Sequence, residues 1–425
     1  MNSAPAGATR RRLYVFSPMP PQRNGLADYI VENLPLLSQD FEVFVVVASD
    51  QLGAVARARP AAAGWSVIGE AEFIARQPDA GGQVLYNLGN NGDCIYMLDH
   101  LHAYPGAVVL HDISLFYLHQ LAAERGSVGS LMAGWLAEDG HLVPPAFVRR
   151  DGALHRTPGV MYQECLMLGR LLRPAAGVLV HTRYAQGRLL GAVPDLCLES
   201  LVRIPHFVLP SEAAVDEPVS ESPGMLARYG IGPQEVLLLV PGFLTGNKML
   251  YEVLAAYRRV QPAAPRLRLV FAGEERPSEY DLSARIAAWW PAGEGPVVTG
   301  YLDAPTLDRL LARADLSFVL RYPTYGESSG ILPRAALGGG RVLTVDIGAY
   351  PEFVSPRVTP LTVGPSLVDD LARAMAEAAE LGPWSPEARR CHQVEEALRQ
   401  AGRTPGALYP SWREWLECCR ERTRP

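Results

Sequence analysis

A turn at residues 321–333, with the sequence RYPTYGESSGILP, has the residue types of an anion-binding site. It follows an apolar run at 316–320 and precedes a helix predicted to begin near Ser329. Its two glycines let the main chain approach a ligand, and the amides of 328–330 would be free at the helix N-terminus. Free amides at that end of a helix bind phosphate. A plain strand-to-helix turn with serine caps would have the same residues.

A second turn, at residues 241–248 with the sequence PGFLTGNK, follows another apolar run at 236–240. It has the outline of a P-loop, but its glycines are one residue too close together, and Met249 stands where a serine or threonine would bind Mg²⁺. We therefore reject a nucleotidase. A lysine at a helix start opposes the helix dipole, so Lys248 indicates a bound anion. The alternative is an ordinary solvent-exposed lysine.

Short apolar runs alternate with helical patterns along the chain and must position these turns. The runs lack polar alternation, which is typical of parallel strands covered by helices on both faces. The predicted strands are 13–16, 43–48, 84–88, 107–111, 177–181, 236–240, 267–272, 316–320 and 342–345. The predicted helices are 26–37, 250–260, 304–314, 331–337 and 411–416. This order predicts doubly wound α/β domains that bind ligands beyond the carboxyl ends of their strands.

The chain is predicted to form two domains, because 425 residues exceed what one hydrophobic core usually serves. A segment without periodicity, 207–224, is rich in proline, serine and glutamate and is expected to link them. The N-terminal domain would span 1–206 and be completed by a C-terminal helix at 409–425, and the second would span 225–408. We expect two Rossmann-like domains that face each other across a ligand-binding cleft.

Composition narrows the classes of partner. A net charge of -6 disfavours a nucleic-acid partner, which normally needs a basic face. No run approaches the roughly 18 apolar residues that a membrane span requires, so only peripheral membrane contact stays open. The six cysteines show no C-x-x-C pair, so we expect reduced thiols in a cytoplasmic protein. The chain has no D-x-D pair, and no metal site is predicted.

Taken together, the motifs resemble the family 4 retaining glycosyltransferases, which have the GT-B fold. The matching residues of the second half are Gly242 with Lys248, FAGE at 271–274, Gly300-Tyr301-Leu302, Gly326 to Gly330, and 346–348 with Pro351-Glu352. Those of the first half are the loop at 16–25, VLHD at 109–112 and the strand end at 178–182. The resemblance covers most of the chain.

The resemblance implies a metal-independent, retaining hexosyltransferase. It would move a hexose-type sugar from a UDP- or GDP-sugar to a hydroxyl of a polysaccharide, glycolipid or secondary metabolite, without a further cofactor. Lys248 would contact the donor diphosphate, Glu327 would bind the sugar hydroxyls, and His111 would lie near the sugar and the new bond. The other donor-binding residues implied are Asn24, Gly25, Gly242, Glu274, Tyr301, Leu302, Ser328, Ser329 and Gly330.

Two positions depart from the family pattern. Ala335 stands where the family has a glutamate that binds the nucleotide ribose, and Phe243 stands where it has an arginine beside the lysine. Losing a cation from the phosphate site costs about 1–3 kcal/mol of charge-assisted hydrogen bonding, unless Arg321 replaces it.

Two alternatives remain open. One is a GT-B sugar-nucleotide enzyme that makes no ordinary glycoside, either an epimerase or a pseudo-glycosidic coupling enzyme. The other is a non-catalytic sugar-nucleotide binding protein, suggested by Phe243 and Ala335. A dehydrogenase is disfavoured, because the first strand leads into PPQRNG and not G-x-G-x-x-G. The acceptor would bind the N-terminal half, where residues 112–160 either line a groove or pack a helical insert. The aromatic and histidine side chains of this stretch include Phe116, Tyr117, Trp135, His141 and His155.

Overall fold

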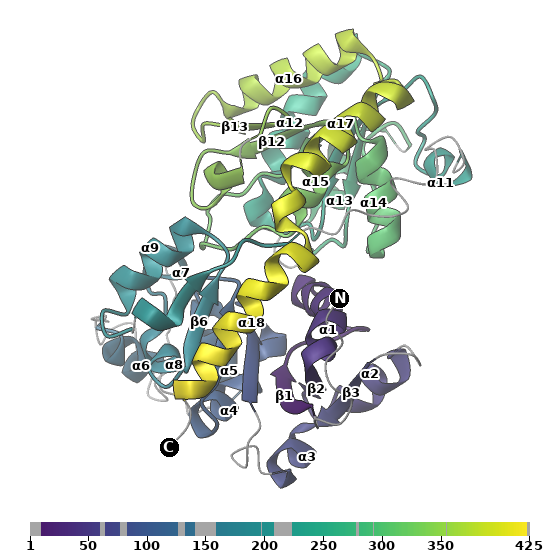
Figure 1. Cartoon of the computed structure of the whole chain (residues 1–425). Helices are drawn as coiled ribbons and strands as arrows, with labels where there is room; N and C mark the ends of the chain where they lie inside the picture. Colours follow the sequence, from purple (N-terminus) through teal and green to yellow (C-terminus); the bar gives the residue numbers. More distant parts are fainter. Residues whose placement is uncertain are drawn as a thin grey trace. The chain divides into compact units, whose positions relative to one another are not determined.

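The protein is known from a computed structural model that divides into two compact units (Figure 1). The first comprises 1–207, 325–328 and 405–425, and the second comprises 208–324 and 329–404. The structure describes residues 10–59, 64–76, 83–125, 132–140, 159–196, 198–207, 223–277, 280–291, 293–353 and 355–422. The predicted linker, 207–224, lies almost entirely outside these ranges.

The first unit is built on a parallel sheet of seven strands in the order β3-β2-β1-β4-β5-β6-β7. Its strands are β1 (Arg11–Phe16), β2 (Phe41–Val47), β3 (Trp65–Gly69), β4 (Gln83–Leu88), β5 (Ala107–Leu110), β6 (Gly177–Val180) and β7 (Leu201–Arg203). The central strands β4, β5 and β6 are buried along their whole length, so neither face of the sheet meets water there. This explains why their sequences are continuously apolar.

Helices cover the first sheet. They are α1 (Gly25–Asp40), α2 (Leu52–Ala58), α3 (Glu70–Ala75), α4 (Met97–Ala103), α5 (Phe116–Glu124), α6 (Met132–Glu138), α7 (Met161–Glu164), α8 (Gly169–Leu172), α9 (Arg183–Ala192) and α18 (Pro405–Arg422). Short 3₁₀ turns lie at Gly92–Cys94 and Leu198–Ser200. Asn24 starts α1, because its side chain accepts a hydrogen bond from the amide of Leu26 at 2.8 Å.

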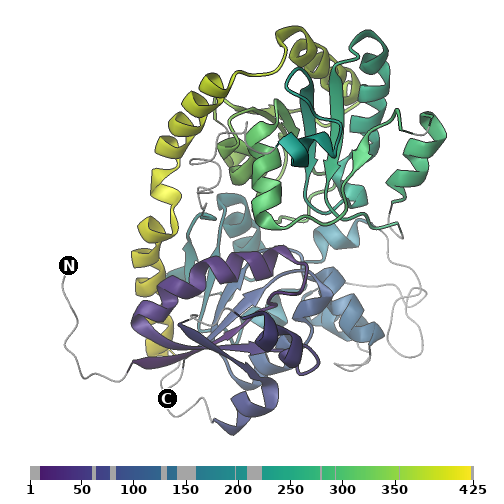
Figure 2. The ribbon, with the colours of Figure 1, turned by 90° about the vertical axis from the view of Figure 1, so that its right-hand side faces the viewer.

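The C-terminal helix α18 belongs to the first unit, where it packs against α1 and β6 (yellow in Figures 1 and 2). Trp412 and Trp415 are buried in the same cluster as the strands β1 and β2. The side-chain amide of Gln83 donates to the carbonyl of Leu416 at 2.6 Å. A Cβ at Gly177 would lie 2.5 Å from the sulfur of Cys419, so only glycine lets α18 approach β6 this closely.

The second unit repeats the plan with six parallel strands in the order β10-β9-β8-β11-β12-β13. Its strands are β8 (Val236–Pro241), β9 (Leu267–Ala272), β10 (Val297–Val298), β11 (Leu316–Phe318), β12 (Arg341–Val345) and β13 (Val358–Leu361). Its helices are α11 (Pro223–Ala227), α12 (Leu250–Val260), α13 (Leu282–Trp289), α14 (Ala304–Arg313), α15 (Ile331–Leu337), α16 (Leu367–Leu381) and α17 (Pro386–Arg399). Short 3₁₀ turns lie at Gly246–Lys248, Gln261–Ala263, Tyr350–Phe353 and Ala401–Arg403.

A buried ion cluster joins four parts of the second unit, namely β8, the end of α14, the start of β11 and α17. One carboxylate oxygen of Asp315 accepts from the guanidinium of Arg313 at 2.8 Å and from the amide of Leu237 at 2.7 Å. The other accepts from Arg389 and from the amide of Trp384. Asp315 and both arginines are less than a tenth exposed, so all four parts depend on one fully bonded carboxylate.

Four strands were missed by the sequence analysis, namely β3, β7, β10 and β13. They are the two edge strands of each sheet. Each has an exposed or half-buried position within it, unlike the buried runs of the central strands. An edge strand has fewer neighbours to cover it, so its sequence lacks the continuous apolar run by which the central strands are recognised.

Candidate functional site

The carboxyl edge of the first sheet carries a row of polar side chains. Ser17 follows β1, Asn87 lies in β4, and His111, His181 and His206 follow β5, β6 and β7. These five strands are neighbours, so the row crosses most of the sheet at the edge where ligands of such folds bind. Of the five, the sequence analysis assigned a functional role only to His111. The other four could have been found from the sequence, because each is a polar residue at or just beyond the end of a strand.

His111 is enclosed by aromatic rings and is only 7% exposed. The ring of Tyr29, from α1, lies 4.6 Å from it in an edge-to-face contact, and His181 lies at 4.9 Å. Its Nε2 is 2.6 Å from the side-chain oxygen of Asn87. Burial, followed by the nearby His181 and His206, lowers the pKa of His111 well below 6.5. The imidazole is therefore neutral at pH 7.

Residues 325–328 pack against His111 in the first unit, although the chain on either side belongs to the second. The amide of Ser328 donates to the carbonyl of His111 at 3.0 Å. The amide of Ser114 donates to the carbonyl of Tyr325 at 3.1 Å. The structure thus brings together Glu327 and His111, two residues that the sequence analysis selected from separate motifs.

The side chain of Glu327 is buried, and one of its oxygens accepts a hydrogen bond from the amide of Tyr325 at 2.7 Å. Between them, Gly326 has a φ of +80°, and a Cβ there would lie 2.9 Å from that of Ile113. The turn therefore needs glycine both for its backbone conformation and for its close approach to the chain after β5.

The prediction of three free amides for phosphate is wrong at one position. The sequence analysis expected free amides at Ser328, Ser329 and Gly330, but the amide of Ser328 is bonded to His111. The helix α15 begins at Ile331, with Gly330 as its N-cap residue. The hydroxyl of Ser329, one residue before the N-cap, accepts from the amide of Leu332 at 3.1 Å and so satisfies one amide of the first turn. Two of the turn's polar groups, the amide of Ser328 and the hydroxyl of Ser329, are therefore bonded within the protein.

Lys248 does not open a helix, which corrects the second expectation. It ends the 3₁₀ turn Gly246–Lys248, and Met249, with a φ of +57°, separates it from α12. Its ammonium bends back onto β8 and donates to the carbonyl of Pro241 at 2.8 Å. A Cβ at Gly242 would lie 2.8 Å from the same nitrogen. Gly242 therefore leaves the space that the ammonium occupies.

A second cation stands near Lys248. Arg321 follows β11, and its guanidinium donates to the side chain of Asn247 at 3.0 Å. Burial, followed by the charge of Arg321, lowers the pKa of Lys248 well below 10.5. Two cations held this close favour an anion between or beside them. Lys248 is also the single lysine of the chain, whose other basic side chains are arginines and histidines.

Phe243 forms part of an aromatic group instead of a cation pair. Its ring lies 6.3 Å from that of Tyr301, and the guanidinium of Arg276 lies 5.2 Å from its centre. Tyr301 is 40% exposed and follows Gly300, whose φ is +75°. The adjacent Leu302 packs against the core of the second unit. This group offers a partly exposed aromatic surface, whose two rings are tilted by 38° to each other.

The predicted donor residues of the second unit gather at the carboxyl edge of its sheet. Gly242 follows β8, Glu274 follows β9, Tyr301 follows β10 and Arg321 follows β11, and these strands are neighbours. The carbonyl of Glu274 accepts from the amide of Leu244 at 2.9 Å, so the loops after β8 and β9 are joined. These four predicted residues thus lie at one edge of the second sheet.

At Ala335 the structure shows a buried residue in the core of the second unit, 2% exposed. In the first unit, Gly25 begins α1 beside Asn24, and a Cβ on it would meet open space.

Of the acceptor candidates, Phe116 and Trp135 pack in a small apolar cluster, whereas Tyr117 is 40% exposed. The other two, His141 and His155, lie outside the described residues.

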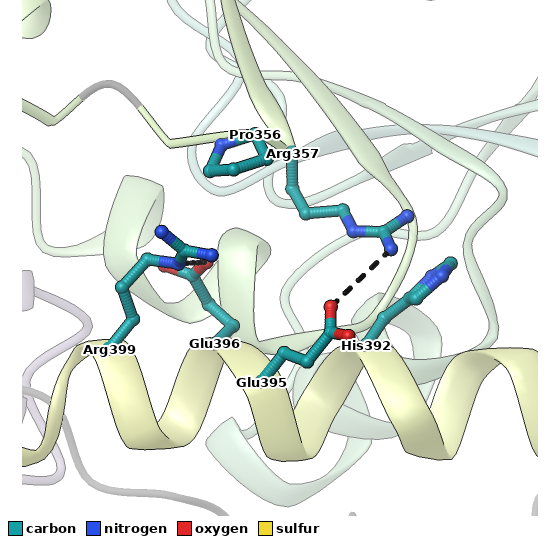
Figure 3. A pocket seen from close by; sticks show the side chains of 6 residues that line it. All are labelled: Pro356, Arg357, His392, Glu395, Glu396 and Arg399. Carbon is teal, nitrogen blue, oxygen red and sulfur yellow. Dashed lines mark ion pairs between the residues drawn. The ribbon is translucent and has the colours of Figure 1, made fainter.

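One pocket lies in the second unit, between α17 and the chain before β13 (Figure 3). It has a volume of about 280 Å³ and is lined by Pro356, Arg357, His392, Glu395, Glu396 and Arg399. Its charges pair with each other, Arg357 with Glu395 at 3.9 Å and Arg399 with Glu396 at 3.6 Å. Because it precedes β13, it lies at the amino edge of the sheet, opposite the predicted donor residues.

The described residues contain no group of three or more histidine, cysteine, aspartate or glutamate side chains able to hold a metal ion. None of their helices combines the length and apolarity needed to cross a bilayer.

Two Rossmann-like units with parallel sheets define the GT-B fold, and solved glycosyltransferase structures share it across nearly the whole chain. HepE of Anabaena, solved with UDP and glucose, has 12% identity, covers 96% of this chain and 100% of its own, and gives a TM-score of 0.64. Sucrose-phosphate synthase of Thermosynechococcus elongatus has 13% identity, coverages of 96% and 98%, and a TM-score of 0.62. WaaG, a glycosyltransferase involved in lipopolysaccharide biosynthesis, has 14% identity, coverages of 95% and 99%, and a TM-score of 0.59.

Residues 225–399 match the family of glycosyl transferases group 1. This region contains Lys248, Arg321, Glu327 and the turn before α15. No curated protein sequence is similar enough to the chain to count as a relative.

Proposed function

We propose that the protein is a retaining glycosyltransferase that moves a hexose-type sugar from a nucleoside-diphosphate sugar to a hydroxyl group. The observation that carries the proposal is the Lys248 ammonium, seated on Gly242 near Arg321 at the carboxyl edge of the second sheet. Two cations in this place suit a diphosphate. The match of 225–399 to glycosyl transferases group 1 supports glycosyl transfer as the activity.

The donor nucleotide is proposed to be UDP or GDP. The aromatic surface of Phe243 and Tyr301 would stack on the base, and Arg276 would take part of the role of the missing family arginine. HepE, which shares the fold, was solved with UDP-glucose, which favours a uridine nucleotide as the first to test. Ala335 brings no carboxylate to the ribose, so we expect the sugar and diphosphate to supply most of the binding energy.

In the proposed reaction, the bond from the anomeric carbon to the diphosphate oxygen breaks as the acceptor oxygen attacks from the same face. The acceptor proton passes to the leaving phosphate oxygen, and the anomeric configuration is retained. Lys248 and Arg321 neutralise the charge that develops on the diphosphate. Glu327 binds the sugar hydroxyls, and His111 lies beside the reacting sugar. A cytoplasmic location and a carbohydrate or small-molecule acceptor stay predictions.

The test has two stages. The melting temperature is first measured with UDP, GDP and dTDP, and we expect UDP or GDP to raise it. The stabilising nucleotide then defines a panel of its sugars, in which release of free nucleotide is followed with and without candidate acceptors.

Each alternative gives a different result. Conversion of the donor to another sugar nucleotide without acceptor would indicate an epimerase. Stabilisation without release of nucleotide from any donor would indicate a non-catalytic binding protein. If none of the three nucleotides stabilises the protein, the proposed donor site is wrong.

A further inference from the structure

The side chain of Asn87 lies 2.6 Å from the Nε2 of His111. The side-chain nitrogen of Asn87 lies 3.2 Å from the carbonyl of Leu26, which accepts but cannot donate. That atom must therefore be the amide nitrogen, and the atom facing His111 must be the amide oxygen. An amide oxygen only accepts, so the Nε2 of His111, 2.6 Å away, must donate.

A directed chain of hydrogen bonds continues beyond Asn87. The amide nitrogen of Asn87 also donates to the hydroxyl of Ser17 at 2.9 Å, and this hydroxyl donates to the carbonyl of Pro18 at 2.9 Å. Every member donates in the same direction, from His111 towards the loop after β1. Such chains strengthen their members by mutual polarisation. Asn87 and Ser17 are both fully buried, so water does not compete for these bonds.

The neutral His111 ring has one proton, and the chain places it on Nε2. Its Nδ1 then carries a lone pair and can only accept a hydrogen bond. Without Asn87, the ring would be free to move its proton to Nδ1 or to rotate. Glu327 and the amide of Ser328 lie beside this histidine, so its orientation matters where the sugar is expected.

We propose that Asn87 is a positioning residue that locks His111 as the Nε2–H tautomer, so that Nδ1 accepts a hydrogen bond from a hydroxyl of a bound sugar. This inference rests on the proposed function for the sugar, but the locked tautomer does not depend on it. The two parts can therefore be tested separately.

The tautomer is measured first, by two-bond ¹H–¹⁵N spectra of the ¹⁵N-histidine-labelled full chain at pH 7. The chain has nine histidines, and His111→Gln identifies the signal of His111. We expect a single neutral form protonated at Nε2. A ring protonated at Nδ1, or at both nitrogens, would overturn the proposal, whatever the protein's activity.

The variant Asn87→Leu removes both polar groups with little change in size. We expect it to give a mixture of tautomers and to lower kcat about tenfold to a hundredfold, while stabilisation by UDP stays unchanged. The matched control is Gln83→Leu, which removes a buried amide of the same strand that donates to the carbonyl of Leu416. This control is expected to keep both the tautomer and kcat.

A double variant separates positioning from a general structural effect. In a His111→Ala background, Asn87→Leu should lower the rate by no more than about twofold, because its partner is gone. An equal loss in both backgrounds would overturn the proposal. If the wild-type protein shows the Nε2–H form but transfers no sugar, the proposed function fails while the tautomer assignment stands.

Discussion

The main-chain amide of Ser328 donates a hydrogen bond to the main-chain carbonyl of His111, with 3.0 Å between nitrogen and oxygen. The two residues come from different motifs that lie far apart in the sequence. Their bond fixes the adjacent Glu327 beside the end of β5 within the first unit. A residue expected to bind the sugar and one expected to lie near the new bond are thus held by the same backbone contact.

The variant Gly326→Ala should loosen this contact. The φ of Gly326, +80°, disfavours any other residue, and the new Cβ would lie 2.9 Å from the Cβ of Ile113. We expect a loss of about 1–3 kcal/mol in unfolding free energy and faster hydrogen exchange at the amide of Ser328. Gly187→Ala is the control, since a Cβ there meets nothing within 4 Å, and it should leave this exchange unchanged.

Lys248→Ala should lower turnover by about 10²–10³-fold while changing the melting temperature little, because the ammonium acts mainly on the diphosphate. Lys248→Arg should also be impaired, since a guanidinium is too large for the place on Gly242. The control is Arg373→Ala, which removes an exposed cation from α16. Transfer at the wild-type rate by Lys248→Ala would show that the site is misassigned.

The ionisation of Lys248 should change when a nucleotide binds. Burial and Arg321 lower its pKa in the free protein, and a diphosphate would raise it again by supplying negative charge. Binding then takes up a proton, so affinity for UDP should fall as pH rises through the pKa of the free lysine. Because the chain has one lysine, ¹³C labelling of lysine gives a single side-chain signal that can be titrated with and without UDP. Equal pKa values in both states would contradict the contact.

Acid should destabilise the first unit through its buried histidines. The Nδ1 of His181 bonds the carbonyl of Ile204, and burial, followed by His206, lowers the pKa of His181 to about 3 from 6.5. Between these values only the unfolded chain takes up the proton, so stability present above pH 6.5 is lost as pH falls. The slope is about 1.4 kcal/mol per pH unit for each such histidine.

His111 adds a second contribution of the same sign, since its pKa is also lowered. Urea titrations at pH 7, 6 and 5 measure the effect, and His181→Gln should remove one proton's share of it. A variant as sensitive to acid as the wild type would show that His181 is not the group responsible.

Asp315→Ala should be among the most destabilising changes in the second unit. It leaves the buried guanidinium groups of Arg313 and Arg389 without their shared carboxylate. The expected loss is about 3–5 kcal/mol of unfolding free energy, measured by denaturant titration. Asp369→Ala removes an ion pair whose partners are 72% and 58% exposed, and it should cost less than about 1 kcal/mol. Similar losses in both variants would contradict this explanation.

The sequence determined the interior of each sheet and much of the helical frame. The helices α12 (Leu250–Val260) and α15 (Ile331–Leu337) have the predicted bounds, and the nine predicted strands are the central ones. Central strands are buried on both faces. Almost every position in them must therefore be apolar, which makes them recognisable in the sequence as continuous apolar runs. The family resemblance that the motifs carry also indicated Lys248, His111 and Glu327 as candidates.

Only the tertiary structure decided which of these side chains meet and in what state. Three contacts show this. The amide of Ser328 bonds the carbonyl of His111, Asn87 bonds the ring of the same histidine, and the ammonium of Lys248 lies against Gly242. Sequence periodicity reports which face of an element is buried, but not its partner there. Hydrogen bonds and pKa values depend on that partner at a range of a few ångströms, which folding alone sets.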